Sequence, residues 1–132
     1  MIRRPLNTQF SVAVRSGRKV TTIRDKAWPL GRPIMLFNWS GVAYRSKQVD
    51  VAVVVVSEVC PVVISRDEDG VMRYMLLVGL EDLMRPEAGP LHESEGFASQ
   101  AEMDEWFRPL LKAGTSVTKQ LMRFELVKGG CC

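Results

Sequence analysis

Residues 49–59 read VDVAVVVVSEV, and this stretch decides the fold of the chain. Most of its side chains are β-branched, and such residues are enriched in strands because they pack well on a pleated surface. Its longest apolar run, residues 51–56, is far shorter than the ~20 residues that a membrane-spanning helix needs. The sequence therefore predicts a central strand over residues 49–59.

Further strands are predicted on both sides of this one. Residues 61–65 are predicted to pair onward as a further strand. Residues 67–70 (DEDG) form a turn, and residues 71–78 are the second arm of the resulting hairpin. Residues 20–24, 33–38 and 115–127 also have strand character, whereas residues 25–32 and 39–41 connect strands. The chain is thus expected to hold about five or six strands.

Helices are predicted where capping residues precede an apolar stripe. Asn7 or Thr8 caps a helix that Gly17 ends, and residues 99–102 (SQAE) fit a capping box for a second helix. The stripe of this second helix ends near Pro109 and consists of Met103, Trp106, Phe107 and Leu110. Residues 80–85 suit a short helical turn and residues 87–94 a loop. Many strands with two or three flanking helices indicate an α+β, mainly β fold, closed as a small barrel.

Length, charge and cysteine usage narrow the class of protein. The 132 residues suit one domain, over residues 1–127, followed by a flexible tail over residues 128–132. The net charge of +3 permits an anionic partner such as RNA without requiring one. Three cysteines in no paired framework, one histidine and no CxxC motif predict a cytoplasmic protein that binds no metal. No cofactor is expected, and the lack of a long apolar run predicts no membrane partner.

Residues 17–25 read GRKVTTIRD and concentrate polar chemistry on a short strand-like element. On a regular strand Thr22 and Arg24 share one face, while Ile23 points the other way. Lys19 is out of phase with Thr22, so it is expected before the regular strand or on a bulge. From the residues alone, a solvated edge strand and a functional site explain this run equally well.

This run resembles the signature of the ASCH domain, a small β-barrel fold of the PUA-like superfamily. The chain is similar to small bacterial amidohydrolases that cleave N(4)-acetylcytidine, through Gly17-Arg18-Lys19 followed by Thr22-Ile23-Arg24-Asp25. The resemblance extends to His92, Glu95 and the helix that follows. It implies a catalytic lysine, threonine and glutamate without metal, which correspond to Lys19, Thr22 and Glu95. Glu93 competes with Glu95, since a slip of two residues exchanges them.

Two chemical routes remain open at such a site. In one, Lys19 acts as the base that activates the Thr22 hydroxyl as a nucleophile. In the other, a carboxylate activates a water that attacks directly, while Thr22 and Lys19 polarise the amide. In the first route, Arg24 or a backbone amide stabilises the oxyanion.

Substrate contacts are expected from Arg24 and from residues 39–46. Trp39 or Tyr44 can stack on a pyrimidine, although core packing also suits Trp39. Arg45 and Ser46 can bind phosphate, and exposure to solvent explains them equally well. The predicted partner is an acylated cytidine or cytosine. The alternative is an ASCH module that binds or cleaves RNA, for which the scattered cations of this chain are a weak match.

Overall fold

The computed structural model describes residues 1–77 and 91–127 of the chain. These residues form an α+β, mainly β structure with one six-stranded mixed sheet and short helices. The strands are β1 (Ile2–Pro5), β2 (Thr21–Arg24), β3 (Pro33–Trp39), β4 (Gln48–Arg66), β5 (Met72–Leu76) and β6 (Thr115–Leu126). The helices are α1 (Ser11–Arg15), α3 (Leu91–Ser94) and α4 (Gln100–Phe107), with 3-10 turns η1 (Thr8–Phe10) before α1 and η3 (Arg108–Leu110) after α4.

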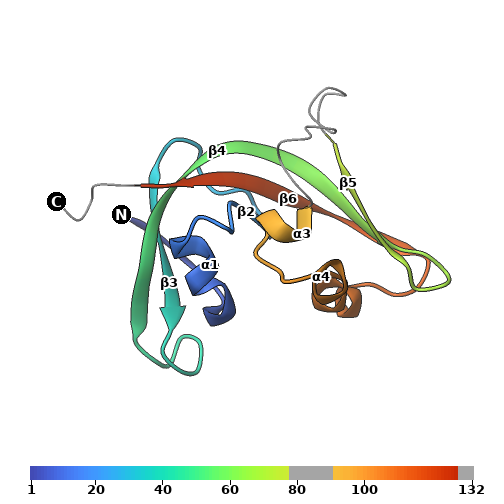
Figure 1. The fold of residues 1–132 in the computed structure, drawn as a ribbon, viewed down its shortest axis with the longest axis horizontal. Coiled ribbons are helices and arrows are strands. Elements are labelled where there is room, and N and C mark those ends of the chain that lie inside the picture. The colour runs from blue at the N-terminus through green and yellow to red at the C-terminus, as the bar shows by residue number, and fades with distance from the viewer. Residues whose placement is uncertain (78–90, 128–132) are drawn as a thin grey trace.

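The 19-residue strand β4 organises the sheet. The strand order is β1-β3-β4-β6-β2, and β5 pairs with β4 off this path. All pairs are antiparallel except β1 with β3, which places Ile2 beside Ile34. In Figure 1 the long strands β4 and β6 arch over α1, α3 and α4, which lie together on the concave side. The helices and the sheet therefore enclose one core.

The sheet does not close into the predicted barrel within residues 1–77 and 91–127. Its path ends at β1 on one side and β2 on the other. A side chain links the two end strands: Arg24 of β2 donates a hydrogen bond of 2.9 Å from Nη2 to the carbonyl of Pro5 in β1. The fold is thus a strongly curved open sheet.

Most predicted elements are present, with three corrections. Residues 49–59 and 61–65 belong to one continuous strand, β4, which absorbs a register shift between Val56 and Glu58. Residues 91–94, expected in a loop, form α3. Trp39, expected in a turn, is the last residue of β3. Strand β1 was not predicted. The predictions for residues 80–85, for residues 87–90 and for the tail 128–132 lie outside the described residues.

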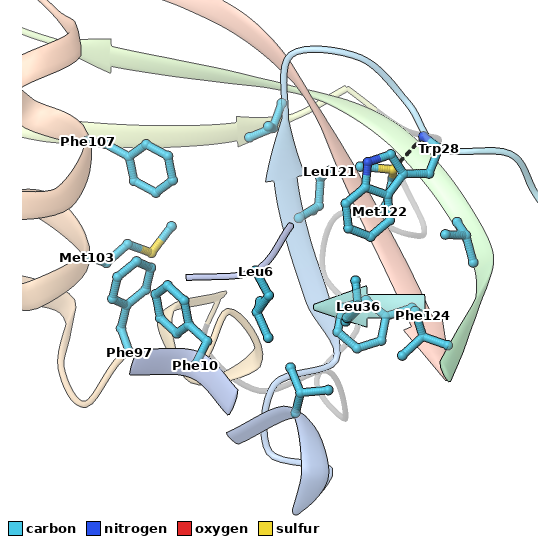
Figure 2. Close-up of a cluster of buried hydrophobic side chains, with 14 of the residues drawn as sticks. Leu6, Phe10, Trp28, Leu36, Phe97, Met103, Phe107, Leu121, Met122 and Phe124 are labelled. Carbon is cyan, nitrogen blue, oxygen red and sulfur yellow. Dashed lines mark hydrogen bonds between the residues drawn. The ribbon is translucent and has the colours of Figure 1, made fainter. Parts of the chain in front are cut away.

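The core fills the concave side of the sheet. Figure 2 shows one group of side chains from η1, α4 and the segment between α3 and α4, and a second group against β3 and β6, with Leu6 between them. The first group holds Phe10, Phe97, Met103 and Phe107, and the second holds Trp28, Leu36, Leu121, Met122 and Phe124. Burying one such side chain contributes about 1.5–3 kcal/mol relative to leaving it exposed. The two groups hold the helices against the sheet, and the candidate site lies where they meet β2.

Candidate functional site

Lys19 is fixed between the end of α1 and the start of β2. Gly17 ends the helix with a φ of +81°, a conformation that glycine adopts without steric cost. The Lys19 amide then donates to the Ala13 carbonyl at 2.9 Å, and the next amide, of Val20, donates to the Ser94 carbonyl at 2.8 Å. Because β2 begins only at Thr21, Lys19 precedes the regular strand, as predicted.

The Lys19 ammonium is almost fully buried, with 4% of the residue exposed. Its Nζ donates to the backbone carbonyls of Thr21 at 2.7 Å and of Glu95 at 2.8 Å. It lies 4.0 Å from Glu95 Oε1 and 4.8 Å from the centre of the Phe10 ring. Burial lowers the pKa of Lys19 below its ordinary value, the Glu95 carboxylate opposes this shift, and Arg24 adds to it.

Glu95 is the carboxylate that reaches this lysine, and only 3% of it is exposed. It follows α3 directly, and its amide donates to the Leu91 carbonyl at 3.0 Å. Its Oε2 accepts a hydrogen bond from Thr21 Oγ1. The competing Glu93 is exposed to solvent. Of the two glutamates, the structure therefore brings Glu95 and not Glu93 to Lys19.

Thr22 and Arg24 lie side by side on β2. The Thr22 side chain is buried, and its Oγ1 accepts a 3.0 Å hydrogen bond from Arg24 Nε. The Arg24 guanidinium is held between the Pro5 carbonyl and the Trp28 ring, whose centre is 4.9 Å away. A guanidinium donates protons and accepts none, so Arg24 can stabilise negative charge near Thr22 but cannot be its base.

A single cavity of about 140 Å³ brings these four side chains together. Its polar lining comes from Asn7 and from the four residues just described, Lys19, Thr22, Arg24 and Glu95. Its apolar lining is largely aromatic and consists of Leu6, Ile23, Phe10, Phe97, Trp106 and Phe107. A lining that combines polar and aromatic side chains suits a flat ligand with a polar edge.

The other predicted substrate contacts lie elsewhere. Trp39 ends β3, and Tyr44, Arg45 and Ser46 belong to the turn before β4. Tyr44 is 87% exposed and packs against Trp39, with ring centres 5.2 Å apart. Ser46 Oγ holds the turn by accepting from the Gly41 amide and donating to the Val42 carbonyl. None of the four lines the cavity.

Thr21, Ser94 and Trp106 are among the site residues that the sequence analysis did not single out. Thr21 contacts Glu95 and lies 3.2 Å, between side-chain oxygens, from Ser94. Trp106 was assigned only to the apolar stripe of a helix, yet it lines the cavity and is 41% exposed. The doubled threonine of residues 21–22 was the available signal for Thr21, whereas the position of Ser94 depends on tertiary contacts.

Two broader observations concern the described residues as a whole. Residues 1–77 and 91–127 contain no group of three or more His, Cys, Asp or Glu side chains placed to hold a metal ion. Within the same ranges, every helix is too short or too polar to cross a membrane.

Comparison with known proteins yields no matching family model, curated protein or solved structure.

Proposed function

We propose that this chain is an amidohydrolase that removes the N(4)-acyl group of an acylated cytosine nucleoside, without a metal ion. The observation that carries the proposal is the convergence of Lys19, Thr22, Arg24 and Glu95 on one cavity. Three of these residues come from one short run near β2, and Glu95 comes from a segment more than seventy residues later. The convergence supports the similarity of residues 17–25 to the N(4)-acetylcytidine amidohydrolases.

The contacts favour the route through an activated water. The hydrogen bond to Thr22 Oγ1 comes from Arg24, which cannot remove its proton. Glu95 is instead the carboxylate of the cavity, and it can accept a proton from water. The water oxygen then bonds to the acyl carbon while its proton passes to Glu95. The bond from carbon to N(4) breaks next, and Glu95 returns that proton to N(4), which yields the carboxylic acid and the free cytosine amine.

Lys19 and Arg24 supply the positive charge that this reaction needs. Two N–H groups of Lys19 are committed to backbone carbonyls, which leaves the third position of its Nζ for the ligand or Glu95. Arg24 and the Thr22 hydroxyl lie on the same strand and can donate to the developing oxyanion. A fixed donor of this kind accelerates acyl transfer by ~10²–10³-fold.

The aromatic residues of the cavity are a better surface for the pyrimidine than Trp39 and Tyr44. Trp106 contacts the rings of Phe10 and Phe97, with centres 5.5 Å and 5.9 Å away, and is still 41% exposed. A base stacked there gains about 1–3 kcal/mol. Trp106 therefore replaces Trp39 and Tyr44 in the proposed substrate contacts.

The test is release of cytidine from N(4)-acetylcytidine, followed by chromatography with and without a chelator. The parent protein should release cytidine equally in both conditions. Lys19→Ala and Thr22→Ala should each lose at least about 10²-fold in kcat/KM, because each removes a group that stabilises the transition state. Exposed Lys112→Ala and Thr118→Val are the matched controls and should keep parental rates. Full turnover by Lys19→Ala or Thr22→Ala would refute the assigned site.

A second function, RNA binding, is favoured by the turn between β3 and β4. Tyr44 is highly exposed and packs against Trp39 with its ring tilted, next to the exposed cations Arg45 and Lys47. Exposed rings beside cations bind single-stranded nucleic acid. If no cytidine is released, this alternative predicts RNA binding that weakens steeply with salt and is lost in Tyr44→Ala.

A further inference from the structure

Behind Glu95 lies a chain of oxygen atoms that the proposed reaction does not use. Glu95 Oε2 contacts Thr21 Oγ1, which lies 3.2 Å from Ser94 Oγ, which in turn donates to the Leu91 carbonyl at 3.0 Å. The two hydroxyls come from β2 and from the last residue of α3. The chain thus begins at the buried carboxyl and ends at a backbone acceptor.

The hydroxyl protons along this chain of oxygens can be arranged in two ways, depending on whether Glu95 carries a proton. When Glu95 is ionised, Thr21 donates to Glu95 and Ser94 donates to Leu91, so no proton lies between the two hydroxyl oxygens. When Glu95 carries a proton on Oε2, it donates to Thr21, Thr21 donates to Ser94, and Ser94 still donates to Leu91. Adding a proton to Glu95 Oε2 and rotating the Thr21 hydroxyl toward Ser94 converts the first arrangement into the second, with the O–H bond of neither hydroxyl broken. Every hydroxyl proton has an acceptor in both.

We propose that Thr21 and Ser94 form a hydroxyl relay that keeps the Glu95 carboxyl hydrogen-bonded in both of its protonation states. Thr21 is a positioning residue, because it acts through Glu95 and does not line the cavity. An aliphatic residue at position 21 would leave the carboxyl without this partner, at the cost that a buried unpaired polar group carries. This inference deepens the proposed function, since the reaction requires Glu95 to gain and lose a proton.

A glutamine at position 95 reports on the relay without any catalysis. Glu95 Oε1 is the oxygen nearer to the Lys19 Nζ, at 4.0 Å, so the carbonyl oxygen of a glutamine prefers that side. Its NH₂ group then faces Thr21 and donates to Thr21 Oγ1, as the protonated carboxyl would. Thr21 must in turn donate to Ser94. In Glu95→Gln the Ser94 hydroxyl becomes a required acceptor, whereas in the parent it is not.

The experiment is a double-mutant cycle on stability, with Ser94→Ala made in the parent and in Glu95→Gln and measured by urea unfolding. The relay predicts that Ser94→Ala lowers the folding equilibrium constant about fivefold more in Glu95→Gln than in the parent. Loss of the bond from Ser94 to Leu91 occurs in both backgrounds and cancels. An equal effect of Ser94→Ala in the two backgrounds would overturn the relay.

Kinetics supply the second readout. Thr21→Val should lower kcat for N(4)-acetylcytidine at least tenfold with little change in KM, and should alter the shape of the pH profile. Thr21→Ser, which keeps the hydroxyl, should restore both, and exposed Thr118→Val is the matched control. A Thr21→Val enzyme with parental kcat would overturn the catalytic role of the relay. If the parent releases no cytidine, the proposed function fails, and the stability cycle still decides whether the relay exists.

Discussion

Lys19 combines burial with an unusual set of partners. A buried ammonium loses its hydration, which costs several kcal/mol unless other groups replace the water. Here two carbonyls, the Phe10 ring and the more distant Glu95 carboxylate provide that replacement. The replacement is incomplete, because burial still lowers the pKa of Lys19 from its ordinary value of 10.5. Lys19 is therefore one residue through which pH should act on this fold.

The lowered pKa of Lys19 predicts a rise in stability with pH. Between that lowered pKa and 10.5 the unfolded chain binds a proton on Lys19 that the folded chain does not, so the free energy of unfolding increases with pH. The slope reaches at most about 1.4 kcal/mol per pH unit. Lys19→Met removes this contribution, so its stability relative to the parent should fall as the pH rises.

Urea unfolding of both proteins between about pH 7.5 and about pH 9.5 measures this difference. Burial and Asp104 raise the pKa of Tyr74, so that this group titrates above the range, and it is present in both proteins. A stability difference between parent and Lys19→Met that does not change with pH would contradict a lowered pKa.

The residues of the site were only partly predictable from sequence. Lys19, Thr22 and Arg24 belong to one local motif, and chain order pointed to Glu95, with Glu93 as a competitor. Thr21 was missed because strand alternation places neighbouring residues on opposite faces, which suggests that only one threonine is buried. Both are buried here, since Thr21 contacts Ser94 and Glu95 while Thr22 lines the cavity.

At the scale of elements, the segment from α3 to α4 places Glu95 against Lys19. Its turn passes through Gly96, which has a φ of +90°. A Cβ atom at this position would lie 3.1 Å from Lys19 Cβ and 3.2 Å from Lys19 Cδ. Gly96 thus allows the backbone after α3 to approach the lysine closely.

Gly96→Ala should therefore damage the site, and Gly17→Ala is its matched control. Both glycines have positive φ, so either substitution strains the backbone by about 1–2 kcal/mol. A Cβ at Gly17 meets nothing within 4 Å, whereas one at Gly96 crowds the side chains of Lys19 and Phe10 at 3.1–3.2 Å. We expect urea unfolding to show a larger loss of stability for Gly96→Ala than for Gly17→Ala. Gly96→Ala should also lose at least tenfold in kcat/KM, whereas Gly17→Ala should keep the parental activity. Equal effects of the two substitutions would contradict this role of Gly96.

Elements with local signals were predicted well, and those that depend on tertiary contacts were not. The Ser99 hydroxyl caps α4 by accepting from the Glu102 amide, as the capping box indicated. The four residues of α3 are too few for periodicity, and a hydrogen bond from Val20 to Ser94 ties α3 to the start of β2. The prediction ended the central strand at residue 59, whereas β4 continues through Pro61. The Pro61 carbonyl accepts a hydrogen bond from the Leu77 amide just beyond the paired residues of β5, where a missing N–H costs little.

At the scale of the whole molecule, the cavity lies where the two ends of the sheet approach each other. Arg24 of β2 bonds the last carbonyl of β1, and the next residues, Leu6 and Asn7, line the cavity. The sequence could not predict this arrangement, because β1 reads IRRP, without an apolar alternation, and its pairing with β3 spans about thirty residues. The predicted number of strands agrees with the structure only because the missed β1 offsets the merging of residues 49–59 and 61–65 into β4. The predicted closure of the sheet was wrong for residues 1–77 and 91–127.

The most direct test of the central claim is to locate the ligand by NMR. The three tryptophans Trp28, Trp39 and Trp106 each give an indole N–H resonance, and cytidine is added to the ¹⁵N-labelled protein. The account predicts that the Trp106 indole shifts together with the amides of residues 19–24 and 95–97, while the Trp39 indole does not move. Shifts confined to Trp39 and residues 40–47 would contradict it and would place the ligand on the turn between β3 and β4.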